Sequence, residues 1–200
     1  MTRVKICGIT RAEDGLAAAA SGADAIGLVF WPGSPRFVTP EQAQAVVGAL
    51  PPFVTVVGVF VDPEPAEVEA SIAAARLDLL QFHGDEPPRF CQRFSRPYIK
   101  AVRVREGVDL LQYASRYRQA RGLLLDAFVA GTAGGTGVGF DWSLIPKELP
   151  LPVILSGGLT VGNVGQAIER VRPWGVDVSS GGEADKGIKD PRKLAEFMQG

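Results

Sequence analysis

Residues 153–182 read VILSGGLTVGNVGQAIERVRPWGVDVSSGG, in which two short apolar runs are each followed by a glycine-rich turn. The runs Val153–Leu155 and Gly175–Ser179 are continuous rather than alternating, a pattern typical of strands that are buried on both faces. Val161–Val171, which lies between them, has helical character. The stretch therefore predicts a strand, a helix and a further strand, with a glycine turn after each strand.

The same alternation extends over the rest of the chain. Six more apolar runs predict strands at Val4–Ile9, Ala25–Phe30, Thr55–Val61, Leu79–His83, Tyr98–Val104 and Gly122–Phe128. The remaining segments predict helices at Arg11–Ala20, Pro40–Leu50, Pro65–Ala75, Pro87–Phe94, Asp109–Arg118 and Pro191–Met198, and a single turn at Asp141–Leu144. Strand and helix thus alternate along the whole chain.

Helix-start signals follow several of the predicted strands. Thr10 to Glu13 and Thr39 to Gln42 both fit a capping box, in which a hydroxyl and an acid or amide satisfy backbone N–H groups reciprocally. Asp62-Pro63 and Asp190-Pro191 each pair a capping acid with a proline at the first helical position. Helices are therefore expected to begin at these four places.

Eight strands that alternate with helices fit either an eight-stranded α/β barrel or an open doubly wound sheet. Polar or glycine-rich residues follow nearly every strand, whereas an open sheet would concentrate them at one switch point. The strand count and this distribution favour a (β/α)8 TIM barrel. We expect residues 1–200 to form a single domain, at the low end of the length range for such barrels.

Composition excludes several classes of protein. Apolar residues make up 46% of the chain and charged residues 22%, as in ordinary globular domains. The net charge of −1 offers no field that would attract nucleic acid or an anionic membrane. The two cysteines are too few for a disulfide scaffold, and neither a membrane span nor a signal peptide is recognisable. A cytoplasmic protein is expected.

The turns after the last two strands are candidate phosphate ligands. Gly157, Gly158 and Gly181 let the backbone approach an anion closely, and Ser180 adds a hydroxyl donor. The corresponding loops of α/β barrels frequently bind phosphate. The alternative is that these glycines only form tight turns.

Cys7, Asp126 and Asp177 lie at the ends of predicted strands, where a barrel carries its active site. Asp126 interrupts the end of an apolar run, so it must pair with a cation or serve a function. Asp177 follows the same logic, or bonds neighbouring backbone amides. Cys7 is either a small buried apolar side chain or a reactive thiol.

Further candidates follow other strands. His83, the single histidine, could line a substrate pocket or play a structural role, and alone it cannot form a zinc site. Arg36 is either a surface charge or a carboxylate clamp. The loop Gly131–Gly137 could be a lid over the site or a disordered surface loop, because it lacks the complete pattern of a P-loop.

Taken together, the motifs resemble those of the phosphoribosylanthranilate isomerases of tryptophan biosynthesis, and they run in order over nearly the whole chain. The matching pieces are Lys5-Ile-Cys-Gly-Ile-Thr10, Ser34-Pro-Arg-Phe-Val38, Val57-Gly-Val-Phe60, Leu80-Gln-Phe-His-Gly-Asp-Glu86, Asp126 before Gly134-Gly-Thr-Gly137, Phe140-Asp-Trp142, Gly157-Gly-Leu159, Asn163-Val164, and Gly175-Val-Asp-Val-Ser-Ser-Gly181 with Gly187-Ile-Lys-Asp190.

The resemblance implies an Amadori rearrangement of N-(5-phosphoribosyl)anthranilate to 1-(2-carboxyphenylamino)-1-deoxyribulose 5-phosphate. The family's general base corresponds to Cys7 and its general acid to Asp126, while Arg36 corresponds to the residue that holds the anthranilate carboxylate. The glycine turns correspond to the phosphate site. The acid must be protonated when it acts and the thiol at least partly ionised. No metal or organic cofactor is expected, because the iminium intermediate accepts the electrons.

The sequence leaves two alternative functions open. The chain could be a different phosphosugar aminoaldose isomerase of barrel fold, although no internal duplication is visible and Cys7 stands where the histidine-pathway enzyme has an aspartate. It could also be a barrel that only binds a phosphorylated ligand, against which the presence of both Cys7 and Asp126 argues. A homodimer formed through an apolar barrel end is compatible with the sequence.

Overall fold

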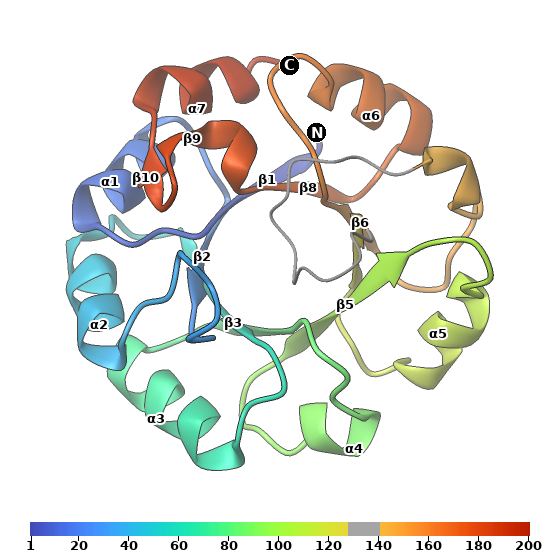
Figure 1. Ribbon diagram of the computed structural model, residues 1–200, viewed down its shortest axis with the longest axis horizontal. Coiled ribbons are helices and arrows are strands. Elements are labelled where there is room, and N and C mark those ends of the chain that lie inside the picture. The colour runs from blue at the N-terminus through green and yellow to red at the C-terminus, as the bar shows by residue number, and fades with distance from the viewer. Residues whose placement is uncertain (128–140) are drawn as a thin grey trace.

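The computed structural model, which describes residues 1–127 and 141–200, contains a closed barrel of eight parallel strands (Figure 1). The strands are β1 Arg3–Cys7, β2 Ala25–Val29, β3 Thr55–Phe60, β4 Leu79–Phe82, β5 Tyr98–Val104, β6 Leu123–Ala127, β7 Val153–Leu155 and β8 Gly175–Val178. Strand β1 pairs with both β2 and β8, so the sheet has no edge. The predicted (β/α)8 barrel is confirmed, and the open sheet is excluded.

Helices form an outer ring around the barrel (Figure 1). They are α1 Ala12–Ala20, α2 Pro40–Ala49, α3 Pro65–Ala75, α4 Pro88–Cys91, α5 Leu110–Arg116, α6 Val164–Val171 and α7 Pro191–Phe197. The single turn predicted after β6 is the 3-10 helix η1, Trp142–Leu144. Helix α4 is much shorter than predicted: it ends at Cys91, and Gln92 and Arg93 form a turn.

A helix begins close to each of the four predicted places, and two of the four predicted caps are confirmed. Thr39 forms a capping box with Gln42 at the start of α2, and the Asp190 carboxylate accepts hydrogen bonds from the first turn of α7. The other two predicted caps are wrong, because both side chains bond elsewhere, and the residues that precede α1 and α3 are Arg11 and Glu64. Thr10 donates its hydroxyl to the carbonyl of a distant loop residue, and Asp62 accepts from a backbone N–H in the loop after β4.

The hydrophobic core has two parts. Outward-facing strand residues such as Ile6, Leu28 and Phe82 pack against the helices. Inside the barrel, a small apolar layer contains Ile99, Ala101, Leu124 and Ile154. Because successive side chains alternate across a strand, the inward positions beyond this layer fall at the carboxyl ends of the strands, where polar side chains such as Gln81, Asp126 and Asp177 stand among apolar ones.

A short hairpin follows β8 that the sequence did not predict. After the 3-10 turn η2, Ser180–Gly182, the antiparallel strands β9 (Glu183–Asp185) and β10 (Ile188–Lys189) pair with each other. Gly187, between the two strands, has a positive φ of 78°, which a side chain would disfavour. The hairpin places two buried charged side chains, Glu183 and Lys189, close to the mouth of the barrel.

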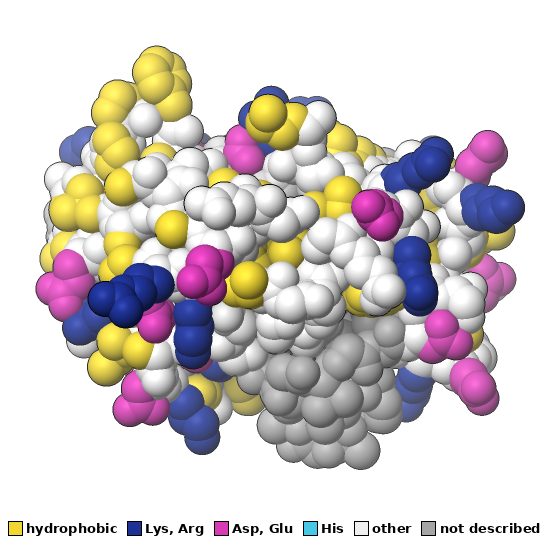
Figure 2. Space-filling model, turned by 90° about the horizontal axis from the view of Figure 1, so that it is seen from above, with side chains coloured by type: hydrophobic (Ala, Val, Ile, Leu, Met, Phe, Trp, Pro, Cys, Tyr) yellow, Lys and Arg dark blue, Asp and Glu magenta, His cyan; other side chains and the backbone are white. Residues whose placement is uncertain are grey.

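Charges of both signs are mixed over the face shown in Figure 2, as expected for a net charge near zero. Hydrophobic side chains protrude along its upper edge. Within residues 1–127 and 141–200, none of the helices has both the length and the apolar character that crossing a bilayer requires.

Candidate active site

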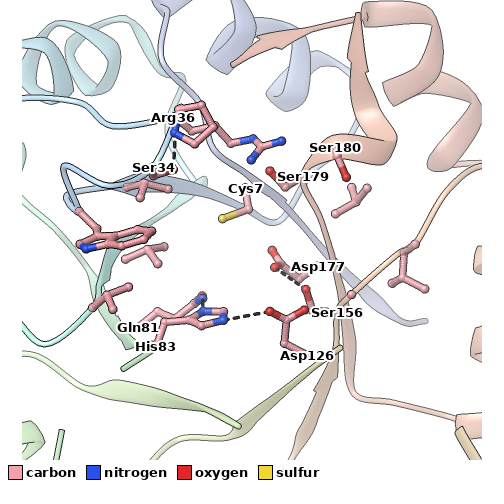
Figure 3. A pocket seen from close by; sticks show the side chains of 18 of the residues that line it. Cys7, Ser34, Arg36, Gln81, His83, Asp126, Ser156, Asp177, Ser179 and Ser180 are labelled. Carbon is pink, nitrogen blue, oxygen red and sulfur yellow. Dashed lines mark hydrogen bonds and ion pairs between the residues drawn. The ribbon is translucent and has the colours of Figure 1, made fainter. Parts of the chain in front are cut away.

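A pocket of about 280 Å³ opens at the carboxyl ends of the barrel strands (Figure 3). Seven of the eight residues singled out from the sequence as catalytic or binding line this pocket: Cys7, Arg36, His83, Asp126, Gly157, Gly158 and Ser180. The structure therefore brings together side chains that lie far apart in the sequence.

Cys7 ends β1 and is buried beside Val29, Val59 and Trp31. It packs over Gly27 of the neighbouring strand, where a Cβ atom would come within 2.7 Å of the sulfur. Burial raises the pKa of the thiol, although the positive charge of Lys5 opposes this effect. The site therefore does not lower the pKa of Cys7, as thiolate chemistry would favour. If Cys7 acts as a thiolate, it does so through the fraction of the thiol that is ionised at working pH.

A buried ion pair lies beneath Cys7 inside the barrel. The Lys5 ammonium donates to Asp177 Oδ1 at 2.7 Å, and the Ser156 hydroxyl donates to Oδ2 at 3.0 Å. Burial acts to lower the pKa of Lys5, but Asp177 and Cys7 raise it above its ordinary value. Asp177 thus bonds side chains rather than the neighbouring backbone amides considered above, and it holds a lysine cation close to the thiol.

Asp126 lies one residue before the end of β6 and forms a short chain of contacts with two side chains from β4 and the loop after it (Figure 3). Its Oδ2 lies 3.0 Å from His83 Nε2, and His83 Nδ1 lies 2.9 Å from Gln81 Nε2. All three side chains are almost fully buried. Both alternatives left by the sequence, a paired aspartate and a functional one, are compatible with this geometry.

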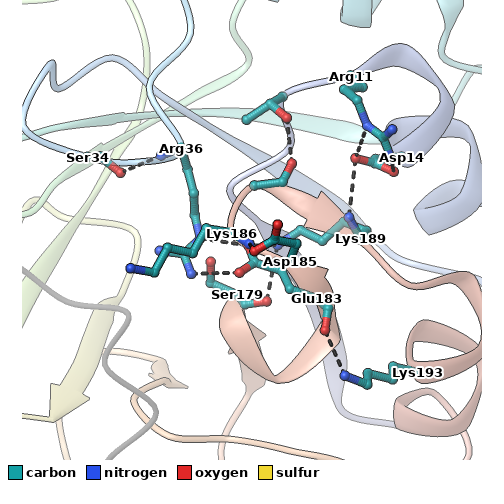
Figure 4. Close-up of polar contacts among 12 residues, drawn as sticks. Arg11, Asp14, Ser34, Arg36, Ser179, Glu183, Asp185, Lys186, Lys189 and Lys193 are labelled. Carbon is teal, nitrogen blue, oxygen red and sulfur yellow. Dashed lines mark hydrogen bonds and ion pairs between the residues drawn. The ribbon is translucent and has the colours of Figure 1, made fainter.

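Arg36 forms a two-bond ion pair with Glu183 of the hairpin (Figure 4). Its Nε and Nη2 each lie 2.7 Å from a Glu183 oxygen, and Lys189 Nζ lies 2.9 Å from the same carboxylate. The hydrogen bond to Glu183 raises the pKa of Arg36 further above its usual range. Arg36 is only 8% exposed, so it is not a surface charge, and part of its fork is already occupied.

The two glycine turns differ in how they contribute. Gly157 and Gly158 have positive φ values of 82° and 68° and line the pocket with Ser180. Gly181 does not line the pocket, and a Cβ atom there would lie 2.1 Å from the Leu159 carbonyl oxygen. Gly181 therefore allows the turn after β8 to pack tightly against the turn after β7.

Several site residues had no role assigned from the sequence. Lys5 interrupts an apolar strand just as Asp126 does, which was a usable signal, but Trp31 and Glu183 lie in segments without a comparable pattern. Over residues 1–127 and 141–200, no group of three or more His, Cys, Asp or Glu side chains is arranged to hold a metal ion. The loop Gly131–Gly137 lies outside the described residues.

Comparison with known proteins assigns the family. The model of the N-(5'-phosphoribosyl)anthranilate (PRA) isomerase family matches residues 4–200. The chain belongs to the PRA isomerase family. These enzymes are the isomerases of tryptophan biosynthesis, as the resemblance of the motifs indicated.

Individual PRA isomerases are similar over almost their full length. The enzyme of Nitrosospira multiformis is 64% identical over 99% of this chain and 95% of its own length. A crystal structure of a PRA isomerase in complex with reduced 1-(o-carboxyphenylamino)-1-deoxyribulose 5-phosphate has a TM-score of 0.88, is 43% identical and covers 100% of this chain and 97% of its own. Monomers derived from the dimeric PRA isomerase of Thermotoga maritima have a TM-score of 0.87 at 40% identity, covering 100% of this chain and 97% of their own.

Proposed function

We propose that this isomerase converts N-(5'-phosphoribosyl)anthranilate to 1-(2-carboxyphenylamino)-1-deoxyribulose 5-phosphate, with Cys7 as general base and Asp126 as general acid. The observation that carries the proposal is that one pocket holds a thiol, a carboxyl group and two glycine turns. Each feature answers one demand of the substrate, which has a ring oxygen to protonate, a carbon acid to deprotonate and a phosphate to bind.

The first step opens the ribose ring. Asp126 gives its proton to the ring oxygen, the bond between that oxygen and C1′ breaks, and the anthranilate nitrogen supplies the electron pair that forms the iminium ion. The Asp126 carboxylate that remains would accept a hydrogen bond from Nε2 of His83, which lies 3.0 Å from Oδ2. This step needs a proton on Asp126 when the substrate is bound.

In the second step, the Cys7 thiolate removes the proton from C2′. The electron pair of that C–H bond forms a double bond between C1′ and C2′, and the π pair of the iminium C=N bond moves to the nitrogen, which leaves an enolamine. Loss of the hydroxyl proton and uptake of a proton at C1′ then give the ketone, so the reaction is balanced without another reactant. The iminium nitrogen accepts the electrons, and for this reason we propose that no metal or organic cofactor takes part.

Binding uses the remaining walls of the pocket. The turn at Gly157 and Gly158, together with Ser180, would hold the phosphate. Arg36 would bind the anthranilate carboxylate with the N–H groups that do not donate to Glu183, since an arginine has five such donors. Glu183 thereby restricts the direction from which the carboxylate can approach.

The direct test is turnover of freshly prepared substrate by the purified protein, followed by loss of substrate fluorescence in the presence of a chelator. We expect turnover that the chelator does not affect. Cys7→Ala and Asp126→Asn should each lower kcat by at least about 100-fold, the usual contribution of a general acid or base. If the protein converts a different phosphosugar aminoaldose and not the anthranilate compound, it is instead another aminoaldose isomerase of barrel fold.

We also propose that the protein forms a homodimer through the end of the barrel opposite the active site. A cavity of about 570 Å³ opens there, lined by Val57, Ile99 and Trp174 among others. Phe53 is fully exposed at its rim and Trp174 is 60% exposed. A second copy of the chain would bury these apolar rings, and a dimer is described for the Thermotoga maritima relative.

A cytoplasmic location is part of the same proposal. Both Cys7 and Cys91 are free and buried. A base that acts as a thiolate must stay reduced, which the cytosol ensures.

A further inference from the structure

We propose that Gln81 is a positioning residue that keeps His83 neutral, with its proton on Nε2, so that Asp126 can hold the proton it donates. This inference rests on the proposed role of Asp126 as the general acid. Gln81 lines the pocket, but its side chain is almost fully buried and hydrogen-bonds His83, through which it would act. The property it sets is the tautomer and charge of the imidazole.

The three side chains are arranged for this task (Figure 3). Gln81 and His83 are two positions apart at the end of β4 and therefore point to the same side of the strand. The imidazole lies between the amide and the carboxyl group, with 2.9 Å from Nδ1 to Gln81 Nε2 and 3.0 Å from Nε2 to Asp126 Oδ2. Each ring nitrogen thus has its own partner.

The orientation of the amide decides which ring nitrogen carries the proton. With Gln81 Nε2 facing the ring, its carbonyl oxygen is buried without a hydrogen-bond partner among the described residues. An amide nitrogen can only donate, so His83 Nδ1 accepts from it and carries no proton itself. The structure therefore favours Gln81 as donor and His83 Nδ1 as acceptor, with the proton on Nε2.

This arrangement disfavours the imidazolium form of His83. An imidazolium carries protons on both nitrogens, and the one on Nδ1 would meet the Gln81 N–H group instead of an acceptor. A positive charge 3.0 Å from Asp126 would also hold that carboxyl group in its ionised form, which has no proton to give. The neutral ring avoids this, and its Nε2–H group still stabilises the carboxylate once the proton has left.

The chain has one histidine, so NMR of isotope-labelled histidine reports on His83 without assignment. For the wild-type protein at about pH 7, we expect the nitrogen shifts of a neutral ring protonated at Nε2. Gln81→Glu replaces the donor by an acceptor and should produce the imidazolium pattern, with kcat lowered by about 100-fold or more and KM nearly unchanged. Gln44→Glu adds the same charge on an exposed face of α2 and should change neither reading.

A wild-type ring protonated at Nδ1, or an imidazolium, would overturn the proposal. So would a Gln81→Glu variant with a neutral ring and full turnover. If the buried carboxylate prevents folding, Gln81→Met removes the donor without adding charge, and the single Nε2-protonated pattern should give way to a mixture of tautomers. The proposed roles of Asp126 and Gln81 can be tested separately. If Asp126 is not the general acid, Asp126→Asn keeps its activity. The NMR pattern of the wild-type histidine still decides the role of Gln81.

Discussion

Arg36, in the loop after β2, and Glu183, in strand β9, are 147 residues apart in sequence and are joined by two parallel hydrogen bonds of 2.7 Å. Both side chains are buried, and Lys189 adds a second cation to the same carboxylate. A paired fork of this kind fixes the orientation of a guanidinium. The proposed substrate clamp is therefore held in place before any substrate arrives.

Removing the charge of Glu183 is expected to weaken both the fold and the clamp. Glu183→Gln leaves Arg36 buried beside a neutral amide, which should lower the free energy of unfolding by about 3 kcal/mol. KM for the carboxylated substrate should rise by about 10-fold because the guanidinium loses its fixed orientation. Urea unfolding and steady-state kinetics measure the two effects. Glu69→Gln, at an exposed position of α3, is the matched control and should change neither.

The same pair predicts a pH dependence of stability. Burial would raise the pKa of Glu183, but the bond from Arg36 and the charge of Lys189 lower it below its ordinary value overall. A carboxyl group with a lowered folded-state pKa stabilises the fold fully above its unfolded pKa of about 4.3, and loses this contribution as pH falls through the folded value. The difference in stability between wild type and Glu183→Gln should therefore be constant near neutral pH and shrink in acid. A difference that grows on acidification would contradict this assignment.

Activity should rise with pH on the alkaline side of neutrality. Burial raises the pKa of Cys7, so only a small part of the thiol is ionised at neutral pH, and that part grows as pH increases. We expect kcat to increase until the folded pKa of Cys7 is reached or the protein loses another essential proton. Rapid alkylation at graded pH would report the same ionisation independently of turnover. A kcat that is flat from neutral to alkaline pH would remove the Cys7 thiolate from the rate-limiting step.

Alanine at the two neighbouring glycines after β8 should affect phosphate binding differently: Gly181→Ala should weaken it and Gly182→Ala should not. A Cβ atom at Gly181 would lie 2.1 Å from a backbone oxygen, so the turn must move and phosphate binding should weaken by at least about 10-fold. At Gly182 the Cβ atom would meet the flexible end of Leu194 at 2.8 Å, which can rotate away. Inhibition by inorganic phosphate measures the difference, with Gly182→Ala as control. Equal inhibition of both variants would show that the turn does not hold the phosphate.

Local patterns were sufficient to predict the barrel, because each strand and each glycine turn is encoded by a few consecutive residues. They could also predict that Cys7 and Asp126 share a pocket, since every strand of a closed barrel ends at the same rim. They could not predict that Arg36 binds Glu183, or that Thr10 bonds the Gly187 carbonyl instead of capping a helix. Those partners meet only when the hairpin after β8 folds back over the first loops.

Phe53 offers a test of the proposed dimer that separates assembly from folding. Its side chain is fully exposed, and its φ of 71° lies in the left-handed region, which costs a non-glycine residue about 1–3 kcal/mol. Phe53→Gly should therefore weaken the dimer, as sedimentation at graded concentration would show, while the separated monomer becomes more resistant to urea. Leu111→Ala removes a different exposed apolar side chain, on α5, and should leave the dimer intact. A wild-type protein that stays monomeric at all concentrations would refute the dimer, and a Phe53→Gly variant that assembles normally would place the interface elsewhere.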